Sequence, residues 1–162
     1  MVLWFAGLAL VIVWQVFRDT AIDYRLVVVG AVLPDLVDVV LGGARVMHTL
    51  AASVVLLTLV MVGTRGWSGA RRRLLALPIA TFLHLVLDGM WSSTEVFWWP
   101  LFGVSFGGAG LPSLSRPVAL VVLQEIVGVG ALAWWWQRFR LQDPERRRAF
   151  VRTGRLGRDL AG

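Results

Sequence analysis

Five apolar stretches with few or no charged side chains constrain this chain more than any other feature of its sequence. They are Val2–Phe17, Leu26–Leu41, Thr49–Thr64, Leu74–Met90 and Pro117–Trp136. A helix that crosses a bilayer needs about 20 apolar residues, and most of these stretches have 16 or 17. Compact packing of the helices or a locally thin bilayer would accommodate the shorter stretches.

A soluble five-helix bundle is the competing interpretation, and the sequence pattern disfavours it. The runs Val54–Val62 and Val118–Val122 have no polar face at the helical period. Charged residues make up only 16% of the chain, against about 25% in average soluble domains. The sequence therefore predicts an all-α, polytopic membrane helix bundle with about five transmembrane segments. We expect Val2–Phe17 to be a retained span, because no charged leader or cleavage site indicates a signal peptide.

The arginine distribution orients the predicted bundle. All 16 basic residues are arginine. With five alternating spans, one side receives only Arg45 and Arg116, and the other side receives all the rest. Positively charged segments stay in the cytoplasm. The sequence therefore predicts a multi-pass protein of the cell (inner) membrane, with its N-terminus outside and its C-terminus inside.

The net charge of +6 and the pI of about 11.5 come almost entirely from the C-terminal tail. Residues 138–162 hold eight arginines against three acids, whereas residues 1–137 are nearly neutral. We therefore divide the chain into a transmembrane domain, 1–137, and a basic cytoplasmic tail, 138–162. Such a tail favours anionic lipid headgroups. Because no nucleic-acid motif accompanies it, membrane lipids are expected as partners and nucleic acid is not.

Ionisable side chains inside the predicted spans are the strongest indication of a function. A charged group at the centre of a span costs about 2.5–3.5 kcal/mol, yet the second stretch holds Asp35 and Asp38, and the fourth holds His84 and Asp88. Their spacings place each pair on one face of a helix. Both pairs lie near the outer ends of their stretches, and His48 falls on the same outer side.

These five side chains are the expected ligands of a divalent metal ion, with zinc favoured. A cation also explains how neighbouring buried carboxylates stay ionised. Because the chain has no cysteine, we expect an open, water-bearing site and not a closed thiolate site. Simpler roles compete for single residues. His84 and Asp88 would bridge helices as a hydrogen-bonded pair, Asp35 would cap a helix after Pro34, and Glu125 would join helices.

Several motifs in sequence order resemble the YdjM-like family of membrane-bound metal-dependent hydrolases. They are GAVLPDLVD at 30–38, GARVMHTL at 43–50, HLVLDGMW at 84–91 and WPLFG at 99–103. The family has a G-x-x-L-P-D stretch, a loop ending in H-[ST]-L and an H-x-x-x-D helix. The resemblance implies a multi-span inner-membrane hydrolase that uses a divalent metal, bound by residues at the positions of Asp35, Asp38, His48, His84 and Asp88. Gly43 stands where the family's loop has its first histidine.

The expected reaction is hydrolysis of an ester or phosphoester in a lipid or lipid-linked substrate at the outer interface. The metal would lower the pKa of a water, and Asp35 or Asp38 would act as general base. The expected substrate-binding residues near this side are Arg45, Thr49, Ser92, Glu95 and Arg116. Two other functions use the same residues: a transport or proton-relay protein without catalysis, and a degenerate family member that acts as a membrane scaffold.

Overall fold

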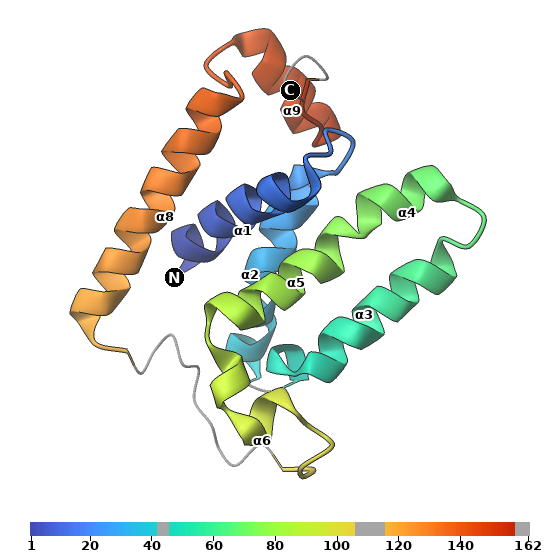
Figure 1. Cartoon of the computed structure of the whole chain (residues 1–162), viewed down its shortest axis with the longest axis vertical. Helices are drawn as coiled ribbons and strands as arrows, with labels where there is room; N and C mark the ends of the chain where they lie inside the picture. Colours follow the sequence, from blue (N-terminus) through green and yellow to red (C-terminus); the bar gives the residue numbers. More distant parts are fainter. Residues whose placement is uncertain (42–45, 106–115, 158–162) are drawn as a thin grey trace.

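The computed structural model describes residues 1–41, 46–105 and 116–157, and these residues form helices and no strands. This confirms the all-α prediction. The elements, labelled as in Figure 1, are α1 (Val2–Phe17), α2 (Tyr24–Val40), the 3₁₀ turn η1 (Val46–His48), α3 (Leu50–Gly63), α4 (Ser68–Leu74), α5 (Ala76–Leu87), the 3₁₀ turn η2 (Met90–Ser92), α6 (Thr94–Phe97), α8 (Val118–Arg138) and α9 (Pro144–Thr153).

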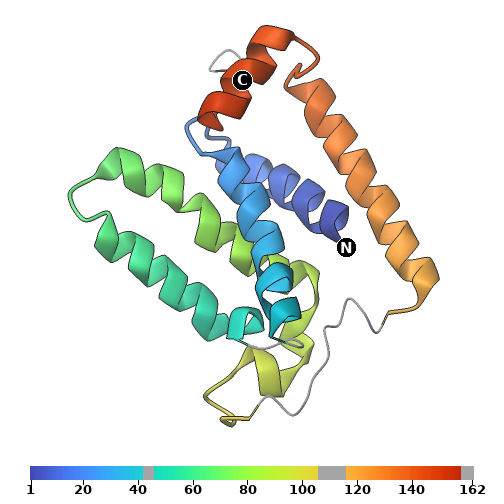
Figure 2. The same cartoon turned by 180° about the vertical axis from the view of Figure 1, so that it is seen from behind.

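The helices pack around α2, which contacts both α1 and α5, while α8 covers α1 and α3 covers α5. Figures 1 and 2 show α9 and the α3–α4 connection at one end of the molecule, and α6 with the ends of α2 and α5 at the other. The main core includes Phe5, Leu10, Trp14, Tyr24 and Trp135. The two ends of the bundle therefore differ: one carries the arginine-rich α4 and α9, and the other carries the predicted site residues.

Four of the five apolar stretches each form one helix, and the fourth does not. Leu74–Met90 was expected as one span, but α5 covers only Ala76–Leu87, after a break from α4 at Leu75. Pro78 has no N–H to donate to the carbonyl of Leu74, which weakens the helix at this point. Asp88 ends α5, and Gly89 follows with a positive φ of 69°.

Helix length supports fewer spans than the sequence predicts. Among the described residues, only α8, with 21 residues, is long and apolar enough to cross a membrane. Helices α1 and α3 are apolar but have 16 and 14 residues. The lengths therefore identify one candidate span and do not support the five-span topology. Most of α8 is exposed, including Val118, Leu123 and Ile126.

Glycines allow the closest helix contacts. A Cβ atom at Gly30 in α2 would lie 2.5 Å from the carbonyl oxygen of Leu77 and 2.9 Å from the Cβ of Ala80, both in α5. Helices α1 and α8 meet in the same way, where a Cβ at Gly7 would lie 2.6 Å from the carbonyl oxygen of Gly128. Any larger residue at these positions would push the backbones apart.

The C-terminal tail docks on the turn between α1 and α2. The backbone N–H of Tyr24 donates to the carbonyl of Gly154 at 2.8 Å, and the Arg25 guanidinium donates to the carbonyl of Val151 at 2.7 Å. Asp23, which is 2% exposed, pairs with Arg25 at 2.8 Å and with Arg73 at 3.4 Å. Asp23 thus joins the start of α2 to α4, and Arg25, which it holds, contacts the last turn of α9.

We predict that Gly30→Ala lowers the free energy of unfolding by about 1–3 kcal/mol, because overpacking forces backbone shifts. The measurement is thermal or denaturant unfolding in detergent, followed by circular dichroism. Gly63→Ala is the control, since no described atom lies within 4 Å of its Cβ position, and alanine favours a helix over glycine. Equal stability of the two variants would contradict the close packing of α2 on α5.

A second prediction concerns Asp23 and pH. Burial raises the pKa of Asp23, but Arg25 and Arg73 outweigh it and lower the pKa below the ordinary value of 3.8. Ionised Asp23 therefore stabilises the fold at neutral pH, and this contribution is lost as pH falls towards the lowered pKa. Asp23→Asn should cost about 1–3 kcal/mol near pH 7, and the difference from wild type should vanish in acid.

The control for Asp23 is Asp143→Asn. Asp143 caps α9 as Asp23 caps α2, but its side chain is 47% exposed. Exposed ion pairs contribute about 0–1 kcal/mol. The melting temperatures of wild type and Asp23→Asn should differ at pH 7 and converge as the pH falls to 2. Asp143→Asn should stay close to wild type throughout. A pH-independent gap between them would contradict a role for the Asp23 charge.

Candidate metal centre

Asp35, His48 and His84 converge at the end of the bundle where α2, η1 and α5 meet. The Nε2 atoms of the two histidines lie 3.4 Å apart. The Oδ1 atom of Asp35 lies 3.5 Å from Nε2 of His48 and 3.6 Å from Nε2 of His84. These three residues are a group that could hold a metal ion. We refer to them as the triad.

His84 is held in place by its other ring nitrogen. Its Nδ1 lies 2.7 Å from the carbonyl oxygen of Ala31 in α2. Because a carbonyl only accepts, Nδ1 carries the proton and Nε2 presents its lone pair to the triad. The ring is fully buried and lies against Phe5 of α1, with ring centroids 3.9 Å apart. His84 therefore has one fixed tautomer and one orientation.

His48 is held by a buried carboxylate. Its Nδ1 lies 2.7 Å from Oδ2 of Asp38, and the backbone N–H of Met47 donates to Oδ1 of the same carboxylate at 3.3 Å. Burial lowers the pKa of His48, but its contacts with Asp35 and Asp38 outweigh this and raise the pKa to about 9. A carboxylate behind a ligating histidine is the usual arrangement at metal sites, where it fixes the ring and increases its basicity.

Pro34 helps to join the two helices that carry the triad. It has no N–H, so it leaves the carbonyl of Gly30 without its usual partner within the helix. The hydroxyl of Thr81 in α5 donates to this carbonyl at 3.3 Å. The next carbonyl along α2, that of Ala31, accepts from His84. Two successive carbonyls of α2 are thus bound by side chains of α5, which fixes the distance between Asp35 and His84.

The triad presents three acceptor atoms to one another. In the neutral forms, with both Nδ1 atoms donating, His48 and His84 each aim a lone pair inwards, and the buried Oδ1 of Asp35 has no hydrogen-bond partner among the described residues. Such an arrangement needs a cation, either a metal ion or an added proton. The raised pKa of His48 shows the same demand for positive charge, because a proton on its Nε2 fills this position when no metal is bound. Tetrahedral ligands at about 2.0–2.1 Å from zinc lie about 3.3–3.4 Å apart. The observed separations of 3.4–3.6 Å therefore fit such an ion.

The other two expected ligands have different neighbours. Asp38 contacts Nδ1 of His48 from behind, outside the triad. Asp88 lies at the end of α5, where Arg116 approaches its Oδ1 at 3.0 Å and donates to its backbone carbonyl at 2.7 Å. Sequence spacing placed His84 and Asp88 on one helix face, but it contained no signal for the arginine 28 residues further on.

The expected substrate-binding residues are dispersed. Thr49 is buried and caps α3 by accepting the N–H of Ala52 at 3.0 Å, and Arg116 pairs with Asp88. Ser92 donates to the carbonyl of Gly89, and Glu95 is exposed in the first turn of α6. Arg45 lies outside the described residues.

Glu125, a residue of α8, lies against the start of α1. It accepts the N–H of Leu3 at 3.2 Å, and its carboxylate is 3.8 Å from the amino group of Met1. This agrees with the expectation that Glu125 joins helices. The contacts of Phe5 and Ala31 with His84 were not predicted from the sequence. The Gly30-x-x-x-Pro34 spacing is a signal for a free carbonyl at Gly30, which Thr81 binds, but not for the bond from His84 to Ala31.

Comparison of the chain with known protein families, curated proteins and solved structures found no match.

We predict that the purified protein binds one divalent ion at the triad. His84→Ala should abolish stoichiometric binding, because it removes one of three ligands. Asp38→Asn should keep the stoichiometry and weaken affinity about 10–100-fold, since it acts through His48. Elemental analysis and competition with a chelator measure both effects. Glu145→Gln, an exposed acid at the opposite end, is the control. Equal metal content in wild type and His84→Ala would contradict a metal site at the triad.

Proposed function

We propose that the protein is an integral membrane hydrolase that depends on a divalent metal, with zinc held by Asp35, His48 and His84. The observation that carries this proposal is the triangle of three acceptor atoms with edges of 3.4–3.6 Å. Two histidines and a carboxylate around an open fourth position are typical of catalytic zinc, whereas structural zinc sites are closed. The motifs that resemble those of the YdjM-like family of membrane-bound metal-dependent hydrolases support the same proposal.

The residues around the triad have separate tasks in this proposal. A bound ion would supply Lewis acidity and lower the pKa of a water towards about 7. Asp38 orients His48. Asp35 would hold the ion through its Oδ1, which leaves the other oxygen of the same carboxylate as the proton acceptor. Asp35 is also the only triad member with an exposed side chain, at 16%, whereas both histidines are at 0%. Water and substrate therefore approach from the side of Asp35.

Arg116 holds Asp88 beside the triad and keeps that carboxylate paired. Its guanidinium lies 3.0 Å from the carboxylate of Asp88. In the proposed site, Arg116 thus holds Asp88 and the end of α5 in place and does not bind an anionic substrate.

The placement in a membrane is also a proposal. Exposed apolar side chains on α1, α3 and α8, including Val2, Leu59 and Ile126, support contact with lipid. The arginine-rich α4 and α9 lie at the end opposite α6 and the triad. With the basic end in the cytoplasm, five short spans would place the N-terminus and the triad on the outer side. The substrate would be an ester or phosphoester of a lipid or lipid-linked molecule at headgroup depth.

A proton relay is the second candidate, and the close approach of His48 and His84 favours it. Their Nε2 atoms are 3.4 Å apart, and Asp35 lies beside both. A proton shared among these groups would also reduce the repulsion between the three acceptor atoms. A protein that contains no metal and changes with pH would support this relay, whereas a metal-loaded protein without hydrolysis would support a scaffold role.

The test is hydrolysis of chromogenic phosphoester and short-chain ester lipids by the zinc-loaded protein in detergent. We predict that Asp35→Asn and His84→Ala lower kcat/KM at least about 100-fold, as expected for loss of acid–base or metal function. Asp38→Asn should have a smaller effect, and Glu145→Gln none. If Asp35→Asn and His84→Ala hydrolyse these lipids as fast as wild type, the triad is not the active site.

A further inference from the structure

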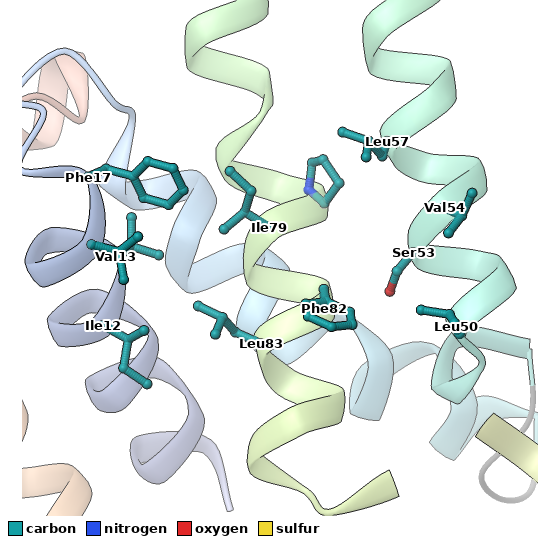
Figure 3. Close-up of a pocket in the computed structure, with 12 residues that line it drawn as sticks. Ile12, Val13, Phe17, Leu50, Ser53, Val54, Leu57, Ile79, Phe82 and Leu83 are labelled. Atoms are coloured by element: carbon teal, nitrogen blue, oxygen red, sulfur yellow. The ribbon is translucent and has the colours of Figure 1, made fainter. Parts of the chain in front are cut away.

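An apolar groove runs between α1, α3 and α5, and we call it the acyl groove. Its volume is about 420 Å³, and four residues from each of the three helices line it. In Figure 3, α5 lies between α1 and α3, so α5 forms the floor and the other two helices form the walls. Ser53 is the only polar residue of the lining.

One end of the groove is next to the triad. Leu50, on the α3 wall, follows His48 by two residues, and Leu83, on the floor, directly precedes His84. Figure 3 shows Leu50 and Leu83 at the same end of the groove, with Leu57 towards the other end. A molecule lying in the groove would therefore have one end close to the triad.

Ser53 indicates that the groove takes a ligand with an acceptor group. Its side chain is 4% exposed, and its Oγ has no hydrogen-bond partner among the described residues. The other hydroxyls within and just after α3 are satisfied by the helix: Thr58 donates to the carbonyl of Val54 at 2.8 Å, and Thr64 to that of Val60 at 2.6 Å. Ser53 alone keeps a free donor, and Figure 3 shows its oxygen between α3 and α5.

We propose that the acyl groove binds one acyl chain of the lipid substrate, with the ester carbonyl near Ser53 and the scissile group at the triad. This inference rests on the proposed hydrolase function and names its substrate class. An apolar groove with a single hydroxyl in its lining matches a hydrocarbon chain with one carbonyl. The volume lies within the range of about 300–1,000 Å³ that is common for ligand sites. Each buried CH₂ strengthens binding about fourfold.

The α3 helix offers a matched pair of variants. Val54 lines the groove, whereas its neighbour Val55 does not, and the two are 52% and 56% exposed. Val54→Trp should fill the groove, and Val55→Trp should leave it open. Leu57→Trp, in the groove, and Leu59→Trp, outside it, are a second pair, so the test stands if one variant fails to fold.

The probe is a phosphatidylglycerol with ether-linked chains, one of which carries a diazirine, so that binding is measured without hydrolysis. After illumination in detergent, mass spectrometry locates the labelled residues. We expect labelling on the facing sides of α1, α3 and α5, reduced at least about tenfold by Val54→Trp and unchanged by Val55→Trp. Equal labelling of both variants would overturn the acyl groove.

Substrate selectivity gives a second readout. Val54→Trp should lower kcat/KM for a long-chain ester at least about tenfold, and leave that for an acetyl ester within about twofold. Ser53→Ala should lower kcat/KM for the long-chain ester about two- to tenfold, as expected for one lost hydrogen bond to the ester carbonyl, and should not change labelling by the ether-linked probe, which has no carbonyl.

Metal analysis separates the two proposals. Metal-dependent hydrolysis without labelling of the groove would leave the hydrolase function and overturn the acyl groove. Groove labelling that Val54→Trp removes, in a protein without metal or hydrolysis, would leave a lipid site and overturn the hydrolase function.

Discussion

The contact between α2 and α5 is the constraint on which the rest of the site depends. Gly30 lets the two backbones approach, and Pro34 leaves a carbonyl that Thr81 binds. The bond from His84 to the carbonyl of Ala31, at 2.7 Å, then fixes both the separation of the helices and the tautomer of the histidine. This one hydrogen bond holds α2 and α5 together and also prepares His84 as a ligand. With Nδ1 bound to the carbonyl of Ala31, Nε2 is left to face the triad.

The three acids at this end of the bundle have different roles because they have different neighbours. Asp38 supports His48, and Asp88 meets Arg116. Asp35 and Asp88 both have buried oxygens without a hydrogen-bond partner among the described residues, but only Asp35 lies beside both histidines without an arginine to pair with it. A buried polar group without a partner costs free energy, and a cation bound between Asp35 and the two histidines would remove this cost.

The sequence predicted the elements of this structure better than their lengths and contacts. Val2–Phe17 forms a helix with the expected bounds, because an uninterrupted apolar run contains no signal to break it. Spacing identified His84 as a candidate ligand, but it could not separate Asp35 from Asp38. The position of His48 decides which acid joins the triad, because its Nδ1 contacts Asp38 and its Nε2 faces Asp35. Residue spacing does not predict where η1 places His48 against α2. The break before α5 follows from the missing N–H of Pro78, whereas hydropathy alone places this residue within an apolar stretch.

Helix length connects the proposed site with its proposed substrate. At a rise of about 1.5 Å per residue, α1 and α3, with 16 and 14 residues, are shorter than the hydrocarbon core of about 30 Å. In the proposed placement, the bilayer would thin around these helices, or lipid headgroups would reach further down their sides. Because the triad lies just before α3 begins, the ester region of a neighbouring lipid would be at its depth. The acyl groove would then continue from the bilayer itself, so a lipid would enter sideways without leaving the membrane.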